Sequence, residues 1–143
     1  WILEQNDSTA NGLTFCTGSL SARPDNDLIS MVKEFAPRIH FVHLRNTAFL
    51  PNCGFYESGH LCGSVDMFAI VKLLLEEQIR RRKAGRTDTR LPFRPDHGLR
   101  MLDDYHRISN PGYPLVGRLK GLAEIDGLQT GIERCLLECS GDN

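Results

Sequence analysis

Three times along this chain, a short apolar stretch is followed by a longer segment whose apolar residues recur at helical spacing. The apolar stretches cover residues 13–17, 39–45 and 91–96, and we expect each of them to form a β-strand. The helical patterns run from near Pro24 to Phe35, from about Val65 to just before Gly85, and from about Pro114 to near Cys139. Alternation of strands and helices is typical of a parallel sheet covered by helices, so the sequence predicts an α/β fold.

The second expected strand changes in character along its length. Under the two-residue period of a strand, Ile39, Phe41, His43 and Arg45 share one face, which is apolar at its start and polar at its end. The interior of a (β/α)8 TIM barrel has this gradient, but a whole barrel needs about 250 residues. We therefore expect residues 1–143 to be the C-terminal portion of a single TIM-barrel catalytic domain, namely its last three βα units, with the N-terminal strands missing from this chain. A small open α/β domain is the alternative.

Composition excludes some classes of function. The formal net charge is −1, so bulk charge gives no reason to expect binding to nucleic acid. No apolar run approaches the ~18 residues that span a bilayer. The chain begins at Trp1 without an initiator Met or a signal peptide, which predicts a fragment or a processed product. Five cysteines at irregular spacing favour reduced thiols and a cytoplasmic location.

Candidate metal ligands lie where the expected strands end. Cys16 lies near the end of the first strand, His43 near the end of the second on its inward face, and Asp96 at the end of the third. A thiolate, an imidazole and a carboxylate together can hold a transition-metal ion. The plainer interpretations are a small buried hydrophobe for Cys16, a hydrogen-bonded interior histidine for His43, and a turn residue for Asp96.

His97 and Tyr113 are candidates for proton transfer. His97 follows Asp96 directly, at the point where the strict alternation of a strand ends, so both side chains can face the same way. Tyr113 follows Asn110-Pro111-Gly112, a sequence typical of a type II turn, which would fix where the phenol points. Imidazole and phenol can both move protons. The alternatives are a surface histidine and a packing tyrosine.

Five segments of the chain resemble the C-terminal part of the mannonate dehydratase family. They are Phe15-Cys16-Thr17-Gly18-Ser19, His43-Leu44-Arg45-Asn46, Glu57-Ser58-Gly59-His60, Arg94-Pro95-Asp96-His97-Gly98 and Asn110-Pro111-Gly112-Tyr113. Residues 117–124 are similar as well, so the resemblance extends over nearly the whole chain. It implies a TIM barrel related to the xylose isomerase-like enzymes.

The resemblance also implies a reaction. The family removes water from D-mannonate to give 2-keto-3-deoxy-D-gluconate, in hexuronate (glucuronate) catabolism, with Mn²⁺ or Fe²⁺ as cofactor. Matched by motif, Cys16, His43 and Asp96 would be metal ligands, and His97 and Tyr113 would transfer protons. A further histidine ligand of the family lies in the N-terminal strands that this chain lacks.

We expect four further residues to contact the substrate: Arg45, Asn46, His60 and Arg94. Arg45 shares the inward face of its strand with His43, and an inward arginine needs a carboxylate in the protein or on a ligand. His60 lies in a long loop after a strand end, where barrel active sites are built. We expect a small sugar acid as substrate, no nucleic-acid or membrane partner, and a homodimer at full length.

Two alternative functions belong to other classes. One is a sugar or sugar-acid isomerase or epimerase on the same barrel, which would use the same metal but retain the C3 hydroxyl. The other is a catalytically inactive barrel fragment that binds a partner supplying the missing strands.

Overall fold

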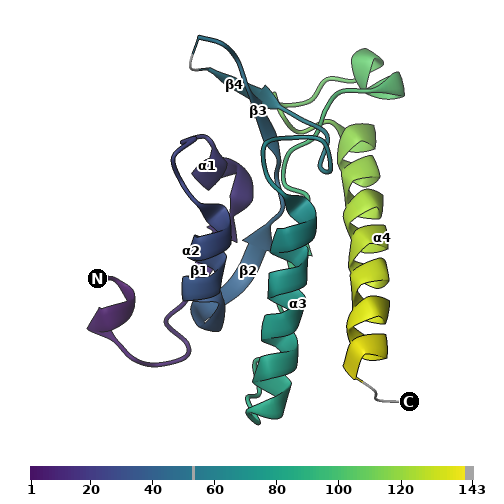
Figure 1. Cartoon of the computed structure of the whole chain (residues 1–143). Coiled ribbons are helices and arrows are strands. Elements are labelled where there is room, and N and C mark those ends of the chain that lie inside the picture. Colours follow the sequence, from purple (N-terminus) through teal and green to yellow (C-terminus); the bar gives the residue numbers. More distant parts are fainter. Residues whose placement is uncertain (53, 141–143) are drawn as a thin grey trace.

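A three-stranded parallel sheet organises the fold (Figure 1). The structure is a computed structural model that describes residues 1–52 and 54–140. Strands β1 (Leu13–Cys16), β2 (Ile39–His43) and β5 (Phe93–Arg94) pair in the order β1-β2-β5, and both pairings are parallel. The predicted α/β fold with a parallel sheet is confirmed.

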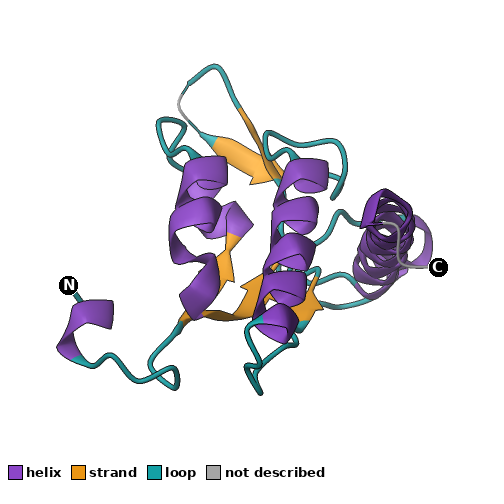
Figure 2. Cartoon of the chain, turned by 60° about the horizontal axis from the view of Figure 1, so that its bottom comes forward, coloured by secondary structure: helices purple, strands orange, loops and turns teal. Residues whose placement is uncertain are grey.

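Helices connect these strands and follow the last one. The α-helices are α1 (Thr17–Ser21), α2 (Leu28–Phe35), α3 (Met67–Lys83) and α4 (Leu115–Ser140), and the 3-10 helices are η1 (Leu3–Gln5), η2 (Ala36–Arg38) and η3 (Leu102–His106). Helix α3 packs between α2 and α4, and the three run side by side (Figure 1). Seen after a turn of the molecule, α2 and α3 lie over the same face of the sheet (Figure 2).

The hydrophobic core lies between the sheet and these helices. Val32 of α2, Val42 of β2, Ile70 of α3 and Ile125 of α4 are fully buried in one cluster. Burying a side chain of this kind contributes roughly 1.5–3 kcal/mol, so this layer supplies much of the driving force for folding. The other face of the sheet is more open, because Phe41 and His43 on β2 are only half-buried.

Two predicted boundaries differ from the structure for identifiable reasons. The strand expected over residues 91–96 is reduced to Phe93–Arg94, because Pro92 and Pro95 have no N–H to donate to a sheet. Helix α3 begins at Met67, two residues after the start expected near Val65, because the Asp66 carboxylate caps it by accepting a hydrogen bond from Ala69 N at 3.0 Å. Ser64, which a start at Val65 would make the N-cap, does not cap the helix. The Ser64 hydroxyl donates instead to the carbonyl of Thr47.

The stretch between β2 and α3, expected to be a loop, contains a β-hairpin. Strands β3 (Thr47–Phe49) and β4 (Phe55–Glu57) pair antiparallel in a sheet of their own. The hairpin lies beyond α2 and α3, at the end of the molecule that also holds the carboxyl ends of the parallel strands (Figure 1). It brings Glu57 to the same end of the molecule as the candidate metal ligands.

Asp104 fixes the start of α4 from outside the helix. Its carboxylate accepts hydrogen bonds from Val116 N (2.9 Å) and Gly117 N (2.8 Å), two of the unpaired donors of the first turn. Burial raises the pKa of Asp104, but the backbone N–H groups of Val116, Gly117 and Met101 outweigh it, and the pKa is lowered. The loop containing η3 is thereby joined to the helix that follows Tyr113.

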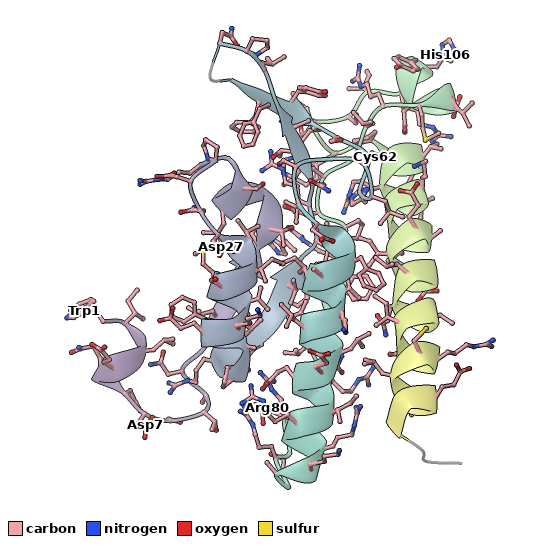
Figure 3. All side chains as sticks on the ribbon, viewed as in Figure 1. Trp1, Asp7, Asp27, Cys62, Arg80 and His106 are labelled. Atoms are coloured by element: carbon pink, nitrogen blue, oxygen red, sulfur yellow. The ribbon has the colours of Figure 1, made fainter. Side chains whose placement is uncertain are left out.

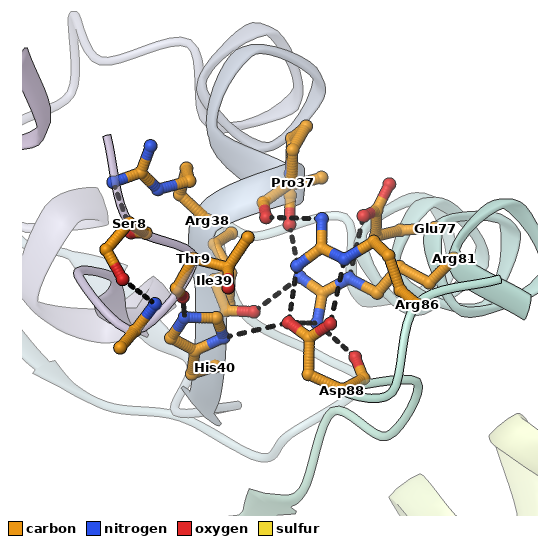
Figure 4. Close-up of polar contacts among 12 residues, drawn as sticks. Ser8, Thr9, Pro37, Arg38, Ile39, His40, Glu77, Arg81, Arg86 and Asp88 are labelled. Atoms are coloured by element: carbon orange, nitrogen blue, oxygen red, sulfur yellow. Dashed lines mark hydrogen bonds and ion pairs between the residues drawn. The ribbon is translucent and has the colours of Figure 1, made fainter. Parts of the chain in front are cut away.

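A second polar network joins the far end of α3 to the start of β2 (Figure 4). The Arg81 side chain is 1% exposed, pairs with Glu77 at 2.8 Å, and donates to the carbonyl of Ile39 at 2.7 Å. Asp88 pairs with Arg86 and lies 3.8 Å from His40 Nδ1. Every buried charge named here has a partner, which a stable interior requires.

The surface adds three observations. Figure 3 shows Cys62 at the hairpin end of the molecule and Arg80 toward the opposite end. Cys16, Cys62 and Cys135 are free cysteines, whereas Cys53 and the Cys139 side chain lie outside the described residues. None of the described helices is both long enough and apolar enough to cross a membrane.

Candidate metal centre

Strand pairing places three of the predicted site residues at one level of the sheet. Cys16 of β1 is in register with His43 of β2, and His43 is in register with Arg94 of β5. Because the strands are parallel, their carboxyl ends meet at one edge, which is where α/β proteins bind ligands. Residues 27 or more positions apart in the sequence therefore become neighbours.

A turn after β5 brings Asp96 back over this edge. Its φ of 63° is in the left-handed region, which aspartate tolerates better than most residues. Its carboxylate is almost fully buried, with Oδ1 accepting from Arg94 Nη2 at 2.7 Å. Oδ2 lies 3.6 Å from His43 Nδ1 and 3.9 Å from Cys16 Sγ. The carboxylate thus faces both of the other predicted metal ligands.

This cluster of Cys16, His43 and Asp96 has the size that a metal ion requires. One ligand atom from each residue lies within 4.8 Å of the other two. Two ligands that are each about 2.0–2.3 Å from one ion can stand up to ~4.4 Å apart, close to the separations observed here. Three protein ligands leave coordination positions for a substrate or water, as in catalytic sites.

The state of His43 also fits a metal ligand. Burial lowers the pKa of His43, Asp96 raises it, and the positive charge of Arg94 together with His97 lowers it again, with a net lowering. The neutral imidazole is the form that binds a metal, so the surroundings favour the competent form. The thiol of Cys16 adds a soft ligand, which suits a transition-metal ion more than Mg²⁺.

His97 and Tyr113 lie together beside this cluster. The two ring centroids are 4.5 Å apart, and His97 Nε2 is 3.8 Å from Asp96 Oδ2. The turn before Tyr113 is closed by a hydrogen bond from Tyr113 N to Asn110 O at 3.0 Å, and Gly112 has the positive φ (79°) that a type II turn requires. The structure therefore brings together both predicted proton-transfer residues and all three predicted metal ligands.

Arg45 is paired within the chain. Its Nε donates to Glu57 Oε2 at 2.9 Å, its Nη2 donates to Glu57 Oε1, and its side chain is 13% exposed. Glu57 thus supplies the carboxylate that an inward arginine needs. Glu57 Oε1 also lies 2.9 Å from His97 Nδ1. Arg45 is therefore connected to His97 by way of the Glu57 carboxylate.

Asn46 and His60 hold the loop that follows β2. The buried Asn46 amide donates to the carbonyls of His60 and Val65 and accepts from Val65 N. The His60 ring is 3% exposed, and its Nε2 lies 3.0 Å from the carbonyl of Pro95. These contacts join the loop after β2 to the segment just before Asp96. The role of Asn46 and His60 as substrate contacts stays a prediction.

Arg94 and Arg118 retain unused hydrogen-bonding capacity. The Nε atoms of both are buried and have no hydrogen-bond partner among the described residues. Arg94 extends from β5 beside Asp96, with its side chain 43% exposed. The Arg118 guanidinium lies 5.4 Å from the ring centroid of Tyr113. Arg94 thus remains a predicted substrate contact with a donor to offer, and Arg118 is a candidate that the sequence analysis missed.

Glu57 is the other residue that the sequence analysis missed. Glu57 begins one of the segments that resemble the family, but it was given no role there. A second signal was indirect, because an inward Arg45 needed a carboxylate. The hairpin that places Glu57 beside His97 has strands of three residues, too short to show a clear alternating pattern.

The parallel sheet, the Cys-His-Asp cluster at its carboxyl edge and the neighbouring histidine and tyrosine define the class: an α/β protein with a candidate metal site. The family model for D-mannonate dehydratase (UxuA) matches residues 1–138, and the chain belongs to this family. The family resemblance predicted from the sequence is confirmed.

Individual relatives agree with this assignment. The mannonate dehydratase of Rhizobium meliloti (strain 1021) is 53% identical over 135 residues, which are 92% of this chain and 34% of that protein. Mannonate dehydratase 1 of Agrobacterium fabrum (strain C58) is 54% identical over 132 residues, 90% of this chain and 33% of that protein. The crystal structure of mannonate dehydratase from Streptococcus suis serotype 2 has a TM-score of 0.79 at 35% identity, over 94% of this chain and 36% of that chain. The chain spans about a third of the length of these relatives.

Proposed function

We propose that this chain carries the metal-binding and proton-transfer part of a mannonate dehydratase, a hydro-lyase that converts D-mannonate to 2-keto-3-deoxy-D-gluconate. The observation that carries the proposal is the cluster of Cys16, His43 and Asp96, with ligand atoms within 4.8 Å of one another, directly beside His97 and Tyr113. Membership of the D-mannonate dehydratase family supports the choice of substrate.

The reaction requires two proton movements and no redox partner. One of His97 and Tyr113 accepts the proton from C2, and the electrons of that C–H bond form the C2–C3 double bond. The other residue donates its proton to the C3 hydroxyl, which departs as water. The enol that remains converts to the 2-keto acid. A divalent ion bound to Cys16, His43 and Asp96 would supply positive charge that stabilises the negative charge developing on the substrate oxygens.

We further propose that residues 1–143 are the C-terminal three βα units of a TIM barrel. Strands β1 and β5 are the two edges of the parallel sheet in the described part of the chain. Closing a barrel removes such edges, and its mouth lies at the carboxyl ends of the strands, where the cluster is found. This arrangement would place the half-buried face of β2 inside the barrel.

The finer identity of the cofactor and the assembly belong to the same proposal. A thiolate, an imidazole and a carboxylate suit Mn²⁺ or Fe²⁺, and a thiol ligand needs the reducing conditions of the cytoplasm. The homodimer and the absence of nucleic-acid and membrane partners stay predictions.

The test is the product formed by the full-length parent protein. Metal-depleted protein is incubated with D-mannonate, with and without Mn²⁺ or Fe²⁺ under anaerobic conditions, and the products are identified by mass spectrometry and NMR. We expect metal-dependent formation of 2-keto-3-deoxy-D-gluconate. A product of unchanged mass that retains the C3 hydroxyl would contradict the dehydratase and indicate an isomerase or epimerase.

A further inference from the structure

A chain of polar contacts leads from β2 through the hairpin to His97. Arg45, which follows β2, donates to both carboxylate oxygens of Glu57 on β4, and Glu57 Oε1 lies 2.9 Å from His97 Nδ1. The side chains of the three residues are only 13%, 21% and 18% exposed. Polar contacts in such shielded surroundings are stronger than the same contacts in water.

The direction of each hydrogen bond follows from the chemistry of the groups. A guanidinium can only donate, so both oxygens of Glu57 act as acceptors toward Arg45. A carboxylate in this role offers His97 an acceptor and no hydrogen. His97 must therefore donate through Nδ1–H, and in the neutral ring Nε2 is then the atom with the free lone pair.

That free lone pair points to the reactive side of the site. His97 Nε2 is the ring nitrogen that lies 3.8 Å from Asp96 Oδ2, beside the metal ligands. The ring is also confined by its neighbours, because it packs on Tyr113, and a Cβ on Gly112 would lie 2.5 Å from Nδ1. The ring has little room to turn over and exchange its two nitrogens.

We propose that Glu57 is a positioning residue that fixes the tautomer and orientation of His97, so that Nε2 and not Nδ1 faces the reacting carbon or oxygen. The proposal rests on the proposed function, because it assumes that His97 transfers a proton. Arg45 in turn orients Glu57, since it donates hydrogen bonds to both of its carboxylate oxygens. The hairpin of β3 and β4 then contributes a residue to the active site.

A purely structural role for Glu57 makes a different prediction. In that case Glu57 only neutralises Arg45, and removing both charges together would leave His97 unaffected. Removing Glu57 alone would leave the Arg45 charge unpaired and could unfold the hairpin. The informative comparison is therefore between Arg45→Met and the double variant Arg45→Met/Glu57→Leu, which differ only in the carboxylate.

The experiment measures the His97 tautomer and turnover in the full-length parent protein. The ¹⁵N NMR signals of His97 are recorded in metal-free protein labelled at histidine and are assigned by their loss in His97→Asn. We expect Nδ1–H in the parent and in Arg45→Met, and protonation at Nε2 to appear in the double variant. With Mn²⁺ restored, kcat should be lower in the double variant than in Arg45→Met by on the order of 10²-fold, with equal metal content and KM.

Each outcome has a defined meaning. The same tautomer in both variants, or the same kcat, would overturn the positioning role of Glu57. If the parent forms no 2-keto acid, the proposed function fails, but the tautomer comparison still decides whether Glu57 positions His97. Glu76→Gln, which alters an exposed pair with Lys72, serves as the matched control and should change neither readout.

Discussion

At the scale of single residues, the site depends on where individual atoms are held. Asp96 has a left-handed backbone, and Gly112 adopts a φ of 79° where an added Cβ would lie 2.5 Å from His97 Nδ1. These two conformations determine how the carboxylate, the imidazole and the phenol approach one another. Small changes at either position should therefore have large effects on the reaction.

His97→Asn and Tyr113→Phe should each lower kcat by roughly 10²–10⁴-fold, the range that a positioned acid or base contributes. Neither residue belongs to the metal cluster, so the metal content measured by elemental analysis should stay at the level of the parent. Near-normal turnover in either variant would remove that residue from the proton transfer.

Gly112→Ala should disturb both the turn and His97. Alanine in the left-handed region costs about 1–2 kcal/mol, and its Cβ would meet His97 Nδ1 at 2.5 Å. We expect a lower Tm and a lower kcat. The control is Gly127→Ala in α4, where no heavy atom lies within 4 Å of the added Cβ and alanine favours the helix by about 0.5–1 kcal/mol. Equal effects of the two substitutions would contradict the steric argument.

At the scale of elements, the loops carry more of the site than the regular structure does. The hairpin supplies Glu57, and the segment between β5 and α4 supplies Asp96, His97 and Tyr113. Asp104 joins that segment to the start of α4 through two backbone N–H groups. The position of Tyr113 therefore depends on a helix cap that is nine residues away in the sequence.

Asp104→Ala should lower the thermal stability and loosen the start of α4. The N–H groups of Val116 and Gly117 would lose their acceptor in a buried place, which is unfavourable. Hydrogen exchange at these two amides measures the effect directly. Asp103→Ala is the matched control, because Asp103 forms only an exposed pair with Arg107 and should have little influence.

The network at the far end of α3 predicts a dependence of stability on acid pH. The side-chain hydrogen bond from Arg86 lowers the pKa of Asp88 from 3.8 to about 2. The positive charges of Arg86 and Arg81 act in the same direction, and partial burial acts against them. A lowered pKa in the folded state stabilises the protein above the unfolded value, and this contribution is lost as the pH falls from about 3.8 through 2. In Asp88→Asn, the urea concentration at the unfolding midpoint should depend less on pH between about 3.8 and 2 than in the parent. The same pH dependence in both proteins would contradict a lowered pKa of Asp88.

At the scale of the whole molecule, the sequence predicted the sheet and its helices because their patterns are local. Hydrophobic periodicity marked β1, β2, α3 and α4, and Gly85 adopts the positive φ (69°) expected just beyond the end of α3. The faces of the helices were harder to predict, since Phe68 has the helical spacing of the apolar residues of α3 but its side chain is 55% exposed. Periodicity shows that a face is apolar but not which neighbour covers it.

The candidate site was predicted where it follows strand ends and was missed where it depends on contacts through space. Cys16, His43 and Asp96 were recognised because parallel strands end together. The contacts from Arg45 to Glu57 and from Glu57 to His97 were not predicted, because they depend on a hairpin whose three-residue strands leave no periodic signal. Asn46 and His60 were expected to contact a substrate, and only the structure shows that backbone groups contact the Asn46 amide and His60 Nε2.

Metal removal should inactivate the complete enzyme and lower its stability. An ion that binds only the folded state stabilises it by RT ln(1 + [L]/Kd), or about 2.7 kcal/mol at 100 times Kd. We expect chelation to lower both Tm and 2-keto acid formation, and thiol oxidants to do the same through Cys16. Undiminished activity after exhaustive chelation would count against the metal cluster. Cys135→Ser, on an exposed part of α4, should leave the oxidant sensitivity unchanged.

The 80 positions between Cys16 and Asp96 determine when an ion can enter during folding. A zinc finger gathers its ligands from nearby residues, so its metal can drive folding from an early stage. Here the ligands meet only after two long loops have closed and β1, β2 and β5 have paired, which are slow, non-local steps. An ion at this site would therefore be loaded into a sheet that already exists, and we expect a cell short of metal to accumulate folded, empty protein and not unfolded chains.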